Sequence, residues 1–77
     1  MIKVLLFAHL QEKLGKDQLD IETNQIKISE LKHKLKDQYY LNELDGVMTA
    51  INEEYATDED VVKSGDTVAF IPPVSGG

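Results

Sequence analysis

A single amphipathic helix pattern stands between two groups of short strand patterns, and this arrangement restricts the folds open to the chain. The apolar residues Ile28, Leu31, Leu35 and Tyr39 recur at helical spacing and form one stripe. Ser29 is a favourable N-cap residue, and Glu30 places an acid in the first turn, where the helix dipole favours it. We therefore predict one main helix over residues 29–39.

The strand patterns lie on both sides of this helix. Residues 2–7 include β-branched and aromatic residues and carry apolar side chains on both alternating sets, which predicts a central strand buried at least partly on both faces. Residues 8–14 fit one or two helical turns closed by Gly15, and residues 17–23 alternate as an edge strand that pairs back on the first. Beyond the helix we predict strands at 47–52 and 67–71, with a turn at Glu53 and Glu54 and a short return at 55–56.

This order of elements predicts an α+β fold. A helical crossover normally returns a strand parallel to an earlier one with a right-handed connection. The result is a β-grasp, or ubiquitin-like, fold with a mixed sheet of four to five strands covered by one main helix. A ferredoxin-like half has similar elements, but a second full helix is missing. The core candidates are Val4, Leu6, Leu31, Leu35, Val68 and Phe70.

Composition narrows the function. The chain of 77 residues is one domain in size, and its 14 acidic and 8 basic residues give a net charge of −6. All basic residues are lysines, so the charge disfavours nucleic acid and no arginine is present to read bases. No apolar run approaches the roughly 20 residues of a membrane span. We expect a cytoplasmic protein that binds neither nucleic acid nor membrane.

The body of the chain offers no active site. His9 and His33 have no partner at metal-ligand or triad spacing and are interpreted as solvated surface residues. The acidic run 58–60 lacks the spacing of a calcium loop, and Glu53 and Glu54 are interpreted as a polar turn. The chain has no cysteine, which excludes a thiol nucleophile or a thiolate metal site. We predict no metal site.

The two faces of the central strands differ. If Val4, Leu6, Val68 and Phe70 point inward, alternation sends Leu5, Phe7, Ala69 and Ile71 to the opposite face, with Lys3 and Thr67 at its far end. An exposed apolar cluster of this kind beside the C-terminus is a candidate docking surface. Phe7, Leu5 and Ile71 are the predicted partner-binding residues.

The C-terminal sequence Ala69-Phe70-Ile71-Pro72-Pro73-Val74-Ser75-Gly76-Gly77, together with the opening Met1 to Ala8 and residues 64–68, closely resembles the small-subunit family of molybdopterin synthases, the sulfur carriers of molybdenum-cofactor synthesis. The resemblance covers the whole length and is sharpest at the tail. It implies a β-grasp domain over residues 1–71 and a flexible functional tail over residues 72–77.

The resemblance also implies the chemistry. The Gly77 carboxylate would be adenylated on a separate activating enzyme, with consumption of ATP, and then converted to a thiocarboxylate. It would donate sulfur to the cyclic pterin precursor in the large subunit, within a heterotetramer in which this chain is a non-catalytic sulfur donor. No cofactor would be bound permanently. The tail residues that carry Gly77 are Gly76, Ser75, Val74, Pro73 and Pro72.

Three other functions remain open at this point. A sulfur carrier of thiamine synthesis shares the fold and the Gly-Gly end, although we do not expect it to carry the Pro-Pro-Val-Ser spacer. A ubiquitin-like protein modifier would join Gly77 to lysines of its targets. A β-grasp binding module would use no tail chemistry.

Overall fold

The computed structural model describes residues 1–41, 44 and 46–72. The chain begins with the predicted hairpin, in which β1 (Ile2–Leu6) pairs antiparallel with the edge strand β2 (Gln18–Ile21). The short helix α1 (His9–Leu14) lies between them and ends at Gly15, which has the left-handed φ of 77° that glycine tolerates. The predicted helical turn and its glycine stop are both confirmed.

The main helix, α2 (Ile28–Tyr39), begins one residue before the predicted start. Ser29 was predicted as the N-cap, and this is wrong, because Lys27 occupies that position and Ser29 lies inside the helix. The first amides are satisfied by distant backbone, since Ile28 N donates to the Asp60 carbonyl at 2.9 Å and Ser29 N to the Asp58 carbonyl at 3.1 Å. A loop about 30 residues away in sequence therefore satisfies these two amides, while the side chain of Glu30 accepts a local hydrogen bond from the Lys27 amide at 3.3 Å.

Five strands form the main sheet in the order β2-β1-β7-β4-β5. The last three in this order are β7 (Thr67–Ile71), β4 (Met48–Ile51) and β5 (Glu54–Ala56). The two central strands β1 and β7 run parallel, as a helical crossover requires, and the other pairs are antiparallel. The β4–β5 turn consists of Asn52 and Glu53, so the predicted turn at Glu53 and Glu54 is displaced by one residue.

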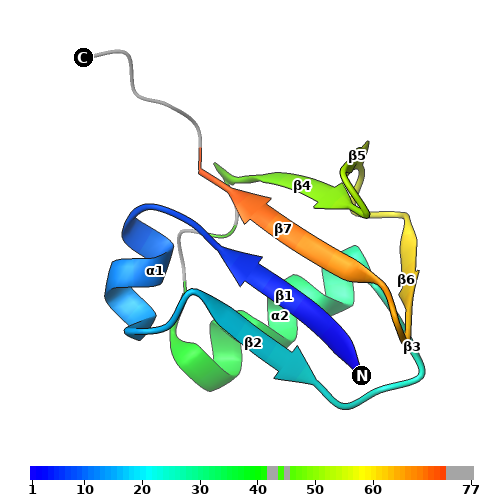
Figure 1. Cartoon of the computed structure of the whole chain (residues 1–77), viewed down its shortest axis with the longest axis horizontal. Coiled ribbons are helices and arrows are strands. Elements are labelled where there is room, and N and C mark those ends of the chain that lie inside the picture. The colour runs from blue at the N-terminus through cyan, green and yellow to red at the C-terminus, as the bar shows by residue number, and fades with distance from the viewer. Residues whose placement is uncertain (42–43, 45, 73–77) are drawn as a thin grey trace.

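A second, two-stranded sheet was not predicted. It pairs β3 (Gln25–Lys27) with β6 (Val61–Lys63), antiparallel. Each strand has three residues, which is too short for alternation to be distinguished from a loop. This small sheet lies at the side of the main one (Figure 1), where it connects the start of α2 to the acidic loop at residues 58–60.

The core lies between α2 and one face of the main sheet. Figure 1 shows α2 crossing behind β1 and β7. The helix residues Ile28, Leu31 and Leu35 are fully buried, and Tyr39 packs partly buried against them. The six predicted core residues are all confirmed as buried: Val4, Leu6, Leu31, Leu35, Val68 and Phe70. A mixed five-stranded sheet with one main helix on one face confirms the β-grasp fold.

Candidate functional site

The predicted reactive end of the chain lies outside the described residues. Pro73, Val74, Ser75, Gly76 and Gly77 belong to this part, so their roles stay predictions. Pro72 is the last described residue; it is buried and directly follows β7. The part of the site that the structure describes is therefore the surface from which the tail departs.

This surface is an open groove of about 640 Å³ on the sheet face away from α2. One row of side chains crosses it through the strand register, in which Leu5 pairs with Ala69, Ala69 with Ala50, and Ala50 with Tyr55. The two middle positions are alanines, while the outer positions carry leucine and tyrosine. Because residues opposite one another share a face, the small side chains form the floor and the large ones the walls.

The end of the groove nearest the tail carries Phe7 and Ile71. Leu6 pairs with Phe70 in the parallel register, so the next residues, Phe7 and Ile71, lie side by side where β1 and β7 end. The Phe7 side chain is 43% exposed, and Leu5 and Ile71 are partly exposed. The structure thus brings together the three predicted partner-binding residues in one groove, while their binding role stays a prediction.

Sequence reasoning missed the other wall of this groove. Tyr55, Asn52 and Glu53 come from the β4–β5 hairpin, and Ala50 completes the floor. Tyr55 is 77% exposed, which is unusual for a large aromatic side chain with nothing in the described structure covering it. The alternation within residues 47–52 predicts that this strand has two different faces, but it does not predict that the strand pairs with β7 and so borders the groove.

The far end of the groove is polar and tightly bonded. The Asn52 side chain donates to the Asp66 carboxylate at 3.0 Å and accepts from the Thr67 amide at 3.0 Å. The Asp66 carboxylate also accepts the Lys63 amide at 2.9 Å. The hydrogen bond from Lys63, together with that from Asn52, lowers the pKa of Asp66 below its ordinary value of 3.8.

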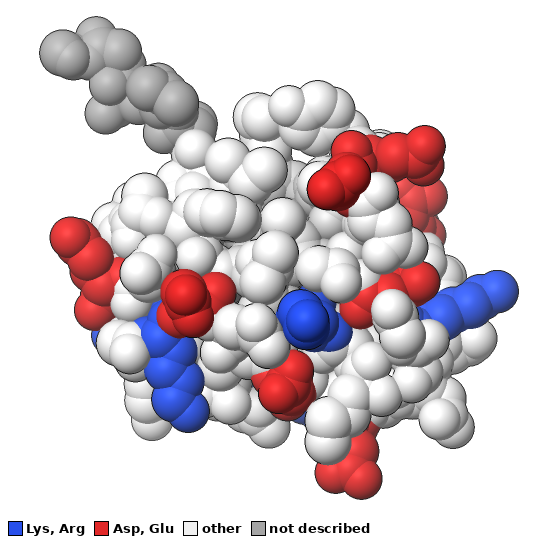
Figure 2. Space-filling view, in the orientation of Figure 1, with Lys and Arg blue, Asp and Glu red and all other residues white. Residues whose placement is uncertain are grey.

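Charge is unevenly distributed over this face of the molecule. In Figure 2, uncharged surface extends over the ends of β1 and β7, and acidic side chains gather over the β4–β5 hairpin. The groove therefore joins an apolar end beside the tail to an acidic end at Glu53. Such a surface suits a protein partner that supplies apolar side chains and positive charge.

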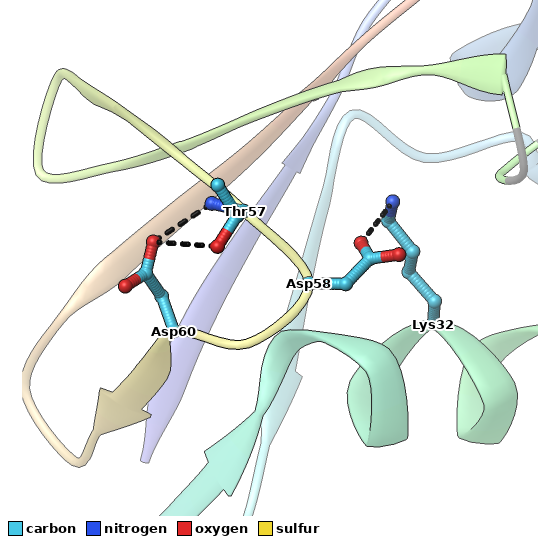
Figure 3. Close-up of polar contacts among 4 residues, drawn as sticks. All are labelled: Lys32, Thr57, Asp58 and Asp60. Carbon is cyan, nitrogen blue, oxygen red and sulfur yellow. Dashed lines mark hydrogen bonds and ion pairs between the residues drawn. The ribbon is translucent and has the colours of Figure 1, made fainter.

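The acidic loop has a structural role in the described region (Figure 3). Asp58 forms an ion pair with Lys32 of α2 at 2.8 Å, and the Lys32 side chain is only 12% exposed. The Asp60 carboxylate accepts the Thr57 amide at 2.7 Å and so closes the loop on itself. These bonds hold in place the carbonyls that accept from the first amides of α2, and residues 58–60 are exposed, as expected for a solvated acidic loop.

His9 and His33 are both exposed, as predicted, and lie on different helices. Within the described ranges, no group of three or more His, Asp or Glu side chains is arranged to hold a metal ion. Of the helices in the same ranges, none is both long and apolar enough to cross a membrane.

Known proteins resemble this chain over its whole length. The sequence profile of the ThiS family matches residues 4–77. Curated relatives named "molybdopterin synthase sulfur carrier subunit" share 33% to 42% identity with it. One of them, from Dictyostelium discoideum, is 40% identical across 97% of this chain and 94% of its own length.

Two solved structures share the fold. SAMP1 from Haloferax volcanii has a TM-score of 0.77 and 25% identity, covering 99% of this chain and 98% of that one. A chain in the complex of subunits 1 and 2 of molybdopterin-converting factor from Helicobacter pylori has a TM-score of 0.71 and 26% identity, with 99% and 97% covered.

Proposed function

The chain belongs to the ThiS family, and from this we propose that it is the sulfur carrier subunit of a molybdopterin synthase. The observation that carries the proposal is the full-length similarity to relatives of that name, and both the family profile and the Escherichia coli relative are matched through residue 77. The apolar groove beside the start of the tail supports it, because a carrier must dock its end into a partner's active site.

The proposed chemistry belongs to the Gly77 carboxylate. A carboxylate accepts no sulfur at neutral pH until one oxygen is made a leaving group. Its attack on the α-phosphate of ATP releases pyrophosphate and forms an acyl-adenylate, from which a sulfur nucleophile displaces AMP to leave a thiocarboxylate. The chain has no cysteine, so no thiol of its own competes for the activated acyl group. The carrier supplies placement, and its partners supply the catalytic groups.

The two terminal glycines fit this task. Without a Cβ they pass through a narrow channel and adopt whatever backbone angles the acyl transfer requires. Residues 74–77, if extended at about 3.3 Å per residue, span on the order of 13 Å. The ring of a proline restricts φ to about −65°, so a Pro-Pro pair at the start of the tail would favour an extended course.

The groove is the proposed docking surface for the large subunit of the synthase. The Helicobacter pylori neighbour was solved as a complex of subunits 1 and 2, which supports a partner of this kind. We assign Phe7, Leu5 and Ile71 to this contact, and we extend it to Tyr55 on the opposite wall. The activating enzyme would use the same groove, so the two partners would bind in turn. Both steps belong in the cytoplasm, where ATP is supplied.

The test is the chemical state of Gly77. The purified chain is incubated with the activating enzyme and sulfurtransferase of the same organism, ATP and a sulfur source, and its intact mass is measured. Replacement of oxygen by sulfur at the C-terminus is the expected result. The two methionines gain a similar mass on oxidation, so alkylation of the thiocarboxylate is the control. An unaltered terminus in the presence of active enzymes would contradict the proposal.

A protein-modifier function is the second candidate, because SAMP1, a small archaeal modifier protein, shares the fold at 25% identity. The two functions differ in what accepts the activated carboxyl. A modifier forms stable amide bonds to lysines, which appear as higher-mass conjugates after incubation with cell extract and ATP. A carrier forms the thiocarboxylate and no such conjugates.

A further inference from the structure

The connection between β1 and α1 is a tight turn with one unusual residue. Leu10 N donates to the Phe7 carbonyl at 3.2 Å, which closes a four-residue turn from Phe7 to Leu10. Glu12 N donates to the Ala8 carbonyl at 3.2 Å, so α1 begins directly from this turn. Ala8, at the second position of the turn, has φ 52° and ψ −130°.

These angles are those of the first central residue of a type II′ turn, the mirror image of the type II value near −60° and +120°. Glycine normally takes this position, because a Cβ is crowded there. Tyr40 also has a positive φ, 58°, but its ψ of 35° places it in the milder left-handed helical region. Positive φ values also occur at Gly15 and Gly65, at 77° and 95°, and at the two residues of the β4–β5 turn, at 50° and 72°. Ala8 is therefore a strained residue where glycine would be relaxed.

The packing around the turn does not require this alanine. Ala8 is exposed, so its methyl group contributes nothing to the core. The turn is held from outside by Leu6 on one side and Leu10 on the other, both buried. Strain that persists because the surroundings impose it is found mainly at functional sites.

The location of the turn links it to the groove. Phe7 precedes Ala8 and lies beside Ile71, one residue before Pro72, at the tail end of the groove. Figure 1 shows α1 and this turn at the end of the sheet where β7 finishes. The Phe7 side chain is 43% exposed, so packing holds it only in part. The turn directly after Phe7 accordingly fixes its carbonyl, through the hydrogen bond from the Leu10 amide, and so restrains the backbone that carries the ring.

We propose that Ala8 is a positioning residue, whose restricted turn holds Phe7 at the tail end of the groove before the partner arrives. The proposal rests on the proposed function for the identity of the partner, the large subunit. The buried side chains of Leu6 and Leu10 exclude the relaxed conformations of the turn. The Cβ of Ala8 then limits the range of backbone angles within the conformation that remains. Glycine at this position would remove the strain but would allow a wider range of backbone angles. Phe7 would then have to be ordered when the partner binds.

Three variants of the full chain distinguish the backbone strain at Ala8 from the restriction that its Cβ places on the backbone angles of the turn. Ala8→Gly removes both. A chain made by chemical synthesis with D-alanine in place of Ala8 removes the strain but keeps the restriction, because D-residues favour these angles. Gly15→Ala is the matched control at the other end of α1, where an added Cβ meets nothing within 4 Å and φ is 77°. It adds strain far from the groove.

Three quantities are measured for each version: the melting temperature, the NMR order parameter of the Phe7 amide, and the Kd for the large subunit. Ala8→Gly is expected to melt at least as high as wild type, to lower the Phe7 order parameter from about 0.85, and to weaken binding roughly three- to tenfold. The D-alanine chain is expected to melt higher with unchanged order and affinity. Gly15→Ala is expected to melt lower with unchanged affinity.

Four results would each overturn the positioning role of Ala8. If Ala8→Gly melts clearly lower, the alanine is not strained. If the Phe7 amide stays equally ordered, or if binding is unchanged, the turn does not position the ring. If the D-alanine chain binds as weakly as the glycine variant, the L-methyl itself contacts the partner. Failure of wild type to bind the large subunit, with the expected loss of order in Ala8→Gly, would reject the proposed function and leave the positioning role supported.

Discussion

The two ends of the five-stranded sheet are built in opposite ways. At the end where β7 begins, Asn52, Asp66 and the Lys63 and Thr67 amides are joined by side-chain hydrogen bonds of 2.9 to 3.0 Å. The Met1 ammonium group donates to Ser64 Oγ at 2.7 Å in the same region. At the end where β7 finishes, Phe7 and Ile71 lie partly exposed in an apolar groove.

This difference suggests a division of roles between the two ends of the sheet, with one end contributing to stability and the other to the proposed function. The hydrogen bonds that join Asn52, Asp66 and the two amides at the polar end are already formed within the chain, so they contribute to the stability of the fold. The apolar end keeps partly exposed apolar side chains, which the proposed partner would bury. Changes at the polar end should therefore affect unfolding, and changes at the apolar end and its tail should affect binding and sulfur transfer.

The largest effect is expected at the tail. Deletion of Gly77 leaves a glycine carboxylate at Gly76 but withdraws it by about 3.3 Å from the reacting atoms. A misplacement of about 1 Å can cost on the order of 100-fold, so adenylation and molybdopterin formation should fall by at least this factor while docking is retained. The measurements are ATP–pyrophosphate exchange and pterin conversion with the large subunit present.

Gly77→Ala is the companion to this deletion. It keeps the length of the chain and adds only a Cβ, so a severe but smaller loss is expected. Normal turnover by the deletion, with its terminus verified by mass, would show that the tail is not the working part.

The next effect concerns the apolar end itself. Phe7→Asp places a charge where a partner must exclude water, and affinity for the large subunit and for the activating enzyme should fall about 10- to 100-fold. Tyr40→Asp is the matched control, because Tyr40 is 73% exposed and lies at the end of α2, away from the groove lining. Calorimetric titration checks both. Equal affinities for the two variants, both folded, would show that the groove is not the docking surface.

Substitutions at the polar end should lower the free energy of unfolding. Asn52→Ala removes the bonds to Asp66 and Thr67 and places alanine at a φ of 50°, so the free energy of unfolding should fall by about 1 to 3 kcal/mol. Asn52→Gly loses the same hydrogen bonds without the backbone strain, so its free energy of unfolding should fall less than that of Asn52→Ala. Urea denaturation measures the two. If the glycine variant is the less stable of the pair, the assignment of strain to this turn is wrong.

The smallest effect is the pH dependence due to Asp66. Its pKa is lowered in the folded state, so its contribution is complete above the ordinary value of 3.8 and is lost as pH falls through the lower folded value. Wild type should therefore exceed Asp66→Asn in stability at neutral pH, and this advantage should shrink in acid below 3.8. Thermal melts across that range measure it. A constant difference between the two proteins would contradict the assignment.

Periodicity within the sequence was sufficient for most of the fold. The stripe of Ile28, Leu31 and Leu35 predicts the helix, and alternation in residues 2–7 and 67–71 predicts both central strands and their buried faces. These patterns are readable because they depend on neighbours three or four residues apart, or two apart in a strand. The candidate reactive group, the Gly77 carboxylate, follows from the resemblance of the C-terminal sequence to a known family, and it stays a prediction.

Other features were decided only by the tertiary structure. The acceptors of the Ile28 and Ser29 amides at the start of α2 are carbonyls of residues 58 and 60, and no sequence pattern near Ser29 predicts them. The pairing of β3 with β6 joins residues far apart in sequence, and so does the row from Leu5 through Ala69 and Ala50 to Tyr55. Each is a contact between distant segments, and its geometry follows from how all the elements pack together. The sequence alone therefore determines which residues face outward, and the packing of the whole chain determines which of them meet to form the groove.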